Sequence, residues 1–484
     1  MRSVVTRSCL ALAALLACGM AAAAGGDPYF ESTGSWQQGY ADQWGLHRIG
    51  FGATAEVPSA WQLAATRAQA TPPKPVIVAI VDTGIDFTHA DLARENLWSN
   101  EAETPNGVDD DRNGYIDDLI GWNFADGNNN PWDRAGHGTH VAGIIGARTG
   151  NGFGVAGIDP LVRLMPLKVL NAIGRGRSAH IAAAIHYAVA NGARVVNLSL
   201  GGENLSAVEQ RAIAHAAQSG VIVVVAAGNL GRDTAGFGMA DLPGVLTVTA
   251  TDPDDRRARF ANFGRAVKIA APGVDILSLR ARDTDLIQIS GAANYREGAA
   301  TVGNDFYRVS GTSFAAAMVS GVTSWLLSQR PELTGVQAAR MIVQSARDIG
   351  APGVDALTGY GIVDARAALA ADPNFRIEAA IADVDLSIRD GQTRVRVLGT
   401  VDADRFAGAR VQAAPEAFPQ DWIDLAPPLA RPARNATLAE AEPRALRGAR
   451  RWIVRALVTH ESGKTREARF TIDLGEAPDP GEKP

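Results

Sequence analysis

Val76-Ile77-Val78-Ala79-Ile80-Val81-Asp82-Thr83-Gly84 is a run of six apolar residues that ends in an acid and a tight-turn pair. A short continuous apolar run is typical of a strand with both faces buried, as in a parallel sheet between helices. Further short, largely apolar runs occupy residues 164–170, 195–200, 221–226, 245–250 and 267–271. Together they predict an α/β fold, a parallel sheet with helices on both of its faces.

Helices are expected between these strands because the intervening segments carry helix-end signals. Residues 179–191 are bracketed by a serine and a glycine. Capping-box pairs, in which Ser or Thr is followed three positions later by Glu or Gln, stand at Ser206 with Glu209 and at Thr334 with Gln337. The alternation of strands with capped helices favours right-handed crossovers.

Four polar residues stand where these expected elements begin or end. Asp82 and Asn229 follow strands and so share the carboxyl edge of the sheet, where ligand chemistry gathers. His137 lies between two glycines at the start of a helical stretch, and Ser313 opens a long helix of small and apolar residues. An acid, a base, a hydroxyl and an amide donor are the groups of nucleophilic acyl transfer.

Each of these residues has a plainer interpretation when it is taken alone. Asp82 and Asn229 could be turn residues, and Ser313 could be an ordinary helix N-cap. His137 and His140, three positions apart, could instead be the metal pair of a metal hydrolase, although no Glu or Cys stands nearby at ligand spacing.

Taken together, four motifs resemble those of the subtilases, the subtilisin-like serine peptidases, over roughly residues 43–371. They are Val81-Asp82-Thr83-Gly84, Gly136-His137-Gly138-Thr139-His140, Ala226-Ala227-Gly228-Asn229 and Gly311-Thr312-Ser313-Phe314-Ala315.

The resemblance implies a bacterial exported serine endopeptidase that forms an acyl-enzyme on Ser313. His137 would be the general base and acid, Asp82 would orient its ring, and Asn229 would belong to the oxyanion hole. Protein or peptide substrates are implied, and no organic cofactor is required. The alternative is a catalytically silent surface-binding or adhesion protein on the same fold. The presence of all four residues argues against that alternative.

The same resemblance implies a substrate-binding edge and a specificity pocket. Ser199, Leu200 and Gly201 would pair with an extended substrate backbone. Ala227 and Gly228 would line the pocket for the side chain before the scissile bond, where small residues leave space for a large apolar group.

Two departures from the family pattern concern the nucleophile helix and this pocket. Ala317 stands where the family usually has Pro four residues after the serine, which should loosen the start of the helix. Residues 237–244 lack an evident aromatic-Pro pair, so the sequence leaves the shape of the pocket open.

A calcium site is also implied by the resemblance. The side-chain oxygens of Asp91 and Asn151, with the carbonyls of Thr149, Phe153 and Val155, would supply the hard oxygen ligands that calcium requires. The other interpretation of this segment is a plain glycine-rich loop.

A second candidate calcium loop precedes His137. Asp109, Asp111 and Asn113, followed by a glycine, match the opening of an EF-hand loop. The closing Glu is absent, so Asp117 or Asp118 would have to serve. A merely solvated acidic turn is the alternative.

The first 24 residues have the pattern of a signal peptide, with two early arginines, an apolar run and a small-residue exit. We therefore expect export, to the periplasm or the medium, and no later stretch is long and apolar enough to span a bilayer. Both cysteines, Cys9 and Cys18, fall in this leader. The sequence before Cys18 also resembles a lipobox, so an outer-membrane lipoprotein acylated at Cys18 is the alternative.

The expected domain boundary follows from a change of sequence pattern near residue 371. After it, apolar and polar residues alternate and no long helix is predicted. This pattern predicts a small all-β sandwich of the immunoglobulin or fibronectin kind. The expected segments are a signal peptide (1–24), an N-terminal arm (25–42), a peptidase domain (43–371), the sandwich (372–476) and a disordered tail (477–484).

The charge balance narrows the choice of partners. The chain has 46 Lys and Arg against 52 Asp and Glu, a formal net charge of -6, with both signs interspersed. This distribution favours neither nucleic acid nor a polybasic membrane contact. We expect a monomer.

Overall fold

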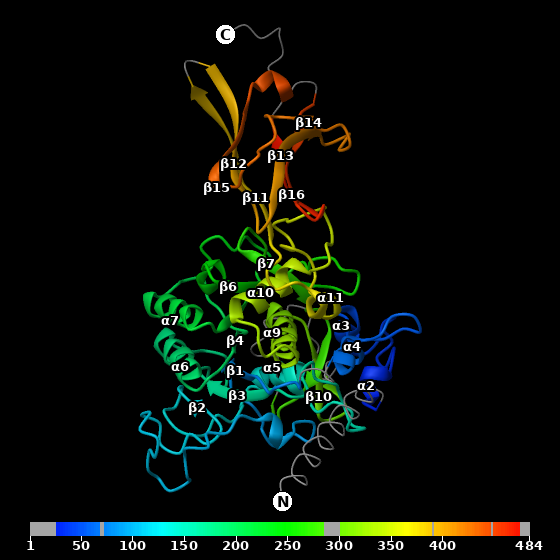
Figure 1. Cartoon of the computed structure of the whole chain (residues 1–484). Helices are drawn as coiled ribbons and strands as arrows, with labels where there is room; N and C mark the ends of the chain where they lie inside the picture. The colour runs from blue at the N-terminus through cyan, green and yellow to red at the C-terminus, as the bar shows by residue number, and fades with distance from the viewer. Residues whose placement is uncertain (1–25, 68–71, 285–300, 390–391, 447–448, 475–484) are drawn as a thin grey trace, which may run out of the picture. The chain divides into compact units, whose positions relative to one another are not determined.

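The computed structural model describes residues 26–67, 72–284, 301–389, 392–446 and 449–474 (Figure 1). The chain divides into two compact units. The first runs to Arg347 and includes Ala356–Pro373, and the second comprises Asp348–Asp355 and the chain from Asn374 onward. The predicted signal peptide and tail lie outside the described residues.

A seven-stranded sheet forms the centre of the first unit, in the order β2-β3-β1-β4-β5-β6-β7 (Figure 1). Every neighbouring pair is parallel, which confirms the predicted α/β class. The strands are β1 (Ile77–Asp82), β2 (Trp122–Asn123), β3 (Arg163–Lys168), β4 (Val195–Leu198), β5 (Ile222–Ala226), β6 (Val245–Thr251) and β7 (Val267–Pro272). The two-residue strand β2 had no signal in the sequence.

The helices of the first unit are α2 (Pro28–Glu31), α3 (Trp44–Arg48), α4 (Ala60–Arg67), α5 (His137–Gly146), α6 (Ser178–Ala190), α7 (Ala207–Gln218), α9 (Thr312–Gln329), α10 (Gly335–Gln344) and α11 (Ala365–Ala370). Two 3₁₀ turns, η1 (Arg94–Asn96) and η2 (Gly238–Asp241), and a small antiparallel sheet of β8 (Ile276–Leu279), β10 (Phe306–Val309) and β9 (Thr301–Val302) complete the unit. Both predicted capping boxes are present, at the starts of α7 and α10.

Burial of β1 on both faces explains its continuous apolar sequence. Val78 and Ile80 belong to the hydrophobic core that includes α5 and α9. Ala79 and Val81, which point the other way, belong to the core that includes α6 and α7. All four are fully buried, so no position of the strand is left for a polar residue until it ends at Asp82.

The second unit consists of two antiparallel sheets, in the orders β11-β12-β15 and β14-β13-β16-β17. They are built from β11 (Ile377–Arg389), β12 (Gln392–Ala403), β13 (Phe406–Pro415), β14 (Ile423–Asp424), β15 (Ala433–Ala441), β16 (Arg451–His460) and β17 (Thr465–Asp473), with one 3₁₀ turn, η3 (Pro443–Leu446). Alternate residues of β16, such as Trp452 and Val454, are buried in a core shared by both sheets. The predicted β-sandwich is confirmed.

Across the described parts of the chain, no helix combines the length and the apolar character needed to cross a bilayer.

Candidate active site

Asp82 and His137 meet at the carboxyl edge of the sheet. The His137 Nδ1 atom lies 2.8 Å from Oδ1 and 2.9 Å from Oδ2 of Asp82, and both side chains are buried. Close approach depends on Gly138, because a Cβ there would lie 2.1 Å from the Gly84 carbonyl oxygen. The carboxylate accepts the Nδ1–H of the ring, so Nε2 is the nitrogen left to exchange protons.

The electrostatic surroundings of His137 favour its protonated form. Burial is the largest single influence and lowers the pKa of His137, but the charge and hydrogen bond of Asp82, with the charge of Asp133, outweigh it. The pKa of His137 therefore lies above its ordinary value.

Asp133 had no part in the sequence prediction and holds the start of α5. Its buried carboxylate accepts the backbone N–H groups of Ala135, Gly136 and Thr139 at 2.8–3.0 Å, and the Thr139 hydroxyl at 2.7 Å. An acid four residues before the histidine was the signal available, and it is a weak one because Asp is common before helices.

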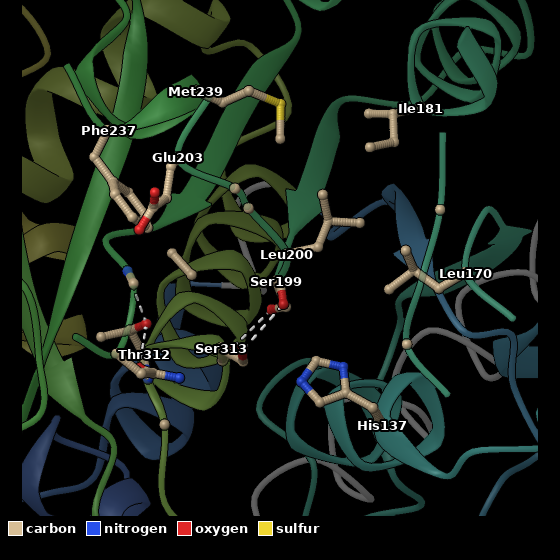
Figure 2. A pocket seen from close by; sticks show the side chains of 18 of the residues that line it. His137, Leu170, Ile181, Ser199, Leu200, Glu203, Phe237, Met239, Thr312 and Ser313 are labelled. Carbon is tan, nitrogen blue, oxygen red and sulfur yellow. Dashed lines mark hydrogen bonds between the residues drawn. The ribbon is translucent and has the colours of Figure 1, made fainter. Parts of the chain in front are cut away.

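Ser313 lies in the first turn of α9 and is not its N-cap, which is Gly311. The Ser313 hydroxyl donates to the Ser199 carbonyl at 3.0 Å, and the Ser199 hydroxyl donates to the Ser313 carbonyl at 2.7 Å. Figure 2 shows the His137 ring turned toward Ser313. Among the hydrogen bonds of the described residues, none joins Ser313 to His137, so the hydroxyl rests on Ser199 in this conformation.

Asn229 is oriented by Thr312, the residue before the serine. Its Oδ1 atom accepts from the Thr312 N–H at 2.9 Å and from the Thr312 hydroxyl at 2.8 Å. The Thr312 hydroxyl oxygen accepts in turn from the Gly228 N–H at 3.1 Å. These contacts use the amide oxygen of Asn229 and leave its NH2 group as the donor for a ligand.

A pocket of about 530 Å³ opens beside these residues, and His137, Asn229 and Ser313 are among those that line it (Figure 2). Of the five predicted substrate-binding residues, four line it: Ser199, Leu200, Gly201 and Gly228. Ala227 does not. It is fully buried beneath the wall, where its carbonyl accepts from the Asn262 side chain at 2.9 Å.

The pocket also has lining residues that the sequence prediction missed, among them Leu170, Ile181 and Glu203. Phe237 and Met239 line it as well and belong to the segment 237–244 that the sequence had assigned to the pocket. Phe237 supplies an aromatic wall in the segment where the sequence left the pocket shape open, and a Cβ at Gly228 would lie 2.6 Å from its ring. No local pattern in the sequence marked Leu170, Ile181 and Glu203 as pocket residues.

The metal-pair interpretation of His137 and His140 finds no support in the structure. The Nε2 atom of His140 lies 3.1 Å from the Ile276 carbonyl oxygen and 2.9 Å from that of Tyr307, so it is a donor. Burial lowers the pKa of His140 to about 3, and its ring packs on Phe314. His140 is thus a neutral core residue whose Nε2 is already used.

The first candidate calcium loop forms with an additional acid from the N-terminal arm. Asp91 Oδ1 and Oδ2 accept from the Asn151 amide at 2.8 Å and from the Val155 N–H at 2.9 Å. Asp27 accepts from the N–H groups of Gly150 and Asn151 at 2.7–3.1 Å. Of the remaining predicted ligands, the Thr149 hydroxyl bonds to the Gly157 carbonyl at 3.1 Å, and Phe153 stacks on Phe306.

The second candidate loop gathers a different set of acids from the one predicted. Ligand oxygens of Glu103, Asp109 and Asp111 lie within 4.8 Å of one another. Asn113 is beside them and donates to Asp111 at 3.1 Å. Asp117 instead accepts from the backbone of the turn at residues 106–107 at 3.0–3.1 Å.

Asp118 is also buried next to this loop and accepts from Asn113 at 3.0 Å, from Asn100 at 2.8 Å and from Tyr187. Burial raises the pKa of Asp118 although these hydrogen bonds lower it. Of the acids at this second loop, the one that groups with the predicted Asp109 and Asp111 is therefore Glu103, which precedes the EF-hand-like stretch.

A buried carboxylate bonded to an imidazole, beside a helix-terminal serine and a free amide donor, has the groups that a serine hydrolase requires. The subtilase family model matches residues 74–361. The chain therefore belongs to the subtilase family.

Three curated relatives illustrate the similarity. The chain is 35% identical over 276 residues to the thermophilic serine proteinase of Bacillus sp. (strain AK1). The matched region covers 57% of this chain and 57% of that one. The chain is 33% identical over 279 residues to the cell wall-associated protease of Bacillus subtilis (strain 168), covering 58% of this chain and 26% of that one. It is 32% identical over 313 residues to thermitase of Thermoactinomyces vulgaris, covering 65% of this chain and 88% of that one.

Proposed function

We propose that this protein is a serine endopeptidase that hydrolyses peptide bonds through an acyl-enzyme on Ser313. The observation that carries the proposal is the buried hydrogen bond between Asp82 and His137, with the imidazole turned toward Ser313 at the wall of the pocket (Figure 2). The similarity to the thermophilic serine proteinase of Bacillus sp. (strain AK1) supports the same reaction class.

The first half of the reaction forms the acyl-enzyme. The Ser313 hydroxyl leaves the Ser199 carbonyl, attacks the carbonyl carbon of the substrate and gives its proton to His137 Nε2. Asp82 stabilises the imidazolium that results. His137 then donates that proton to the leaving amine as the C–N bond breaks.

The second half releases the acyl group by the same route. A water molecule gives its proton to His137 Nε2 and attacks the acyl carbon, after which the proton returns to the departing Ser313 oxygen. In both halves, the Asn229 NH2 group and the Ser313 N–H, at the positive end of α9, stabilise the oxyanion.

Labelling with a fluorophosphonate tests this assignment directly. The folded full chain is expected to be labelled on a single peptide that contains Ser313, and heat-denatured protein is expected to remain unlabelled. A folded protein that takes no label would instead favour the silent surface-binding alternative.

The pH dependence of the reaction follows from the His137 pKa. Only the neutral His137 ring can accept the Ser313 proton, and this neutral form is lost as the pH falls through the raised pKa of His137. The acid limb of the kcat/KM profile is therefore expected to have its midpoint above 6.5. Because the charge of Asp133 contributes to that rise, Asp133→Asn is expected to move the midpoint to lower pH. An unchanged or higher midpoint in a folded variant contradicts this account.

We also propose that calcium binds at one or both acidic loops. At the first loop, burial raises the pKa of Asp27, and burial also raises the pKa of Asp91 to about 7, with a smaller contribution from the charge of Asp27. A divalent cation held by Asp91, Asn151 and the carbonyls of Thr149, Phe153 and Val155 would favour both charges. Asp27 would not be a ligand, and its carboxylate would hold the loop through the N–H groups of Gly150 and Asn151. Calcium would supply stability and takes no part in the chemistry.

Calcium removal is accordingly expected to lower the apparent melting temperature by about 3–5 °C, the shift for a unit of this size and a ligand present at about 100 times its Kd. Asp91→Asn should abolish the calcium-dependent part if the first loop binds the ion, and Asp111→Asn should do so if the second loop does. Equal melting temperatures with calcium and with a chelator, measured by scanning calorimetry, contradict the proposal.

Export and the domain boundaries are proposals as well. We infer export by the leader at residues 1–24, with acylation of Cys18 as the alternative, and a peptidase domain at 43–371 followed by a sandwich at 372–476. The division of the described chain into two compact units near residue 373 supports the last point. N-terminal sequencing of the mature protein distinguishes cleavage near Ala23 from a chain that begins at Cys18.

A further inference from the structure

Glu203 lines one end of the pocket, on the wall that continues from Ser199. It forms an ion pair with Arg232, a residue just outside the described lining. Their side chains are joined at 3.1 Å and are 63% and 45% exposed. The Arg232 guanidinium also lies over the Phe237 ring, 4.9 Å from its centre. Figure 2 shows Glu203 beside Phe237 in the pocket.

The charges that line the pocket are of one sign. Apart from His137, its charged lining side chains are Glu203 and Glu209, and no Lys or Arg is among the described residues that line it. Glu209 is buried and fixed, because its carboxylate accepts from the Ser206 N–H at 3.1 Å in the capping box of α7. A cleft with two carboxylates raises the local concentration of cations.

We propose that the pocket binds the side chain of arginine or lysine from a peptide substrate, at the residue before the scissile bond, with Glu203 as the charge partner. This inference rests on the peptidase function proposed above and names its substrate class. Arg232 shows how such a side chain would bind. Its guanidinium contacts the Phe237 ring and the Glu203 carboxylate, the two groups that a substrate guanidinium would contact. A bound substrate side chain replaces Arg232 as the partner of Glu203.

Glycines and apolar side chains make up much of the pocket wall. Gly201, Gly202 and Gly228 line it without side chains, and the aliphatic and aromatic groups of Leu200 and Phe237 line the same space. The two walls touch near Glu203, because a Cβ on Gly238 would lie 2.2 Å from the Gly202 carbonyl oxygen. A side chain with an apolar stem and a cationic end would pack its stem on these walls and place its charge at Glu203.

Two matched peptides test the proposal. One has arginine before the scissile bond and the other has citrulline, which has the same shape and no charge. We expect wild-type kcat/KM to favour arginine by about two- to fivefold, the range for an exposed ion pair, because Glu203 is more than a third exposed. Glu203→Gln should bring this ratio close to one. Arg232→Gln should raise the ratio, because it removes the internal competitor.

The control is Asp254→Asn, which breaks a similarly exposed ion pair with Arg256 and should leave the ratio unchanged. Equal cleavage of both peptides by the wild type, or a ratio that neither Glu203→Gln nor Arg232→Gln alters, overturns the inference while the peptidase function stands. If no peptide is cleaved and no fluorophosphonate label is taken, the peptidase proposal fails and the inference fails with it.

Discussion

Replacing Ser313 by alanine is expected to lower kcat for a peptide substrate by about 10⁶-fold, the loss found when the nucleophile is removed from a subtilisin. Alanine removes the oxygen that forms the acyl-enzyme. It leaves the pocket and Asn229 in place, so hydrolysis about 10³- to 10⁴-fold above the uncatalysed rate should remain. The measurement is hydrolysis of a chromogenic peptide over hours at high enzyme concentration.

A matched serine distinguishes loss of the nucleophile from loss of the fold. Ser219 is exposed at the end of α7, and Ser219→Ala should keep full activity. Ser313→Ala should show the same circular dichroism spectrum as Ser219→Ala, because neither hydroxyl is needed to cap a helix. Substantial hydrolysis by Ser313→Ala would mean that another group attacks the substrate.

Much of the fold could be predicted from the sequence because its signals are local. Burial on both faces makes β1 apolar at every position before Asp82, and a capping box fixes the start of α7 through residues three positions apart. The short strand β2 was missed because two residues, Trp122 and Asn123, carry no periodicity.

The site likewise contains residues that local motifs predict and contacts that only the fold brings about. Asp82, His137 and Ser313 stand in motifs because each needs glycine or other small residues next to it in the chain, as the contact at Gly138 illustrates. The contacts of Asn229 with Thr312 and of Ser313 with Ser199 join residues 83 and 114 positions apart, so only the fold reveals them. For the same reason the sequence did not show that Asp27 contacts the first candidate calcium loop or that Glu203 lines the pocket.

Asp82→Asn is expected to lower kcat/KM by about 10⁴-fold although the variant remains folded. The asparagine can donate to Nδ1 of His137, which places the ring proton on Nε2, where it blocks transfer from Ser313. It also removes the charge that raises the His137 pKa most, so that the remaining activity should extend to lower pH.

The double variant Asp82→Asn with Ser313→Ala gives the sharpest check, because Asp82 acts only through His137 and the nucleophile. Once the Ser313 oxygen is gone, the ring has no proton to take, and the orientation of that ring no longer affects the rate. The double variant is therefore expected to be no slower than Ser313→Ala alone. If the two losses multiply, Asp82 contributes to the reaction by a route other than its hydrogen bond to His137.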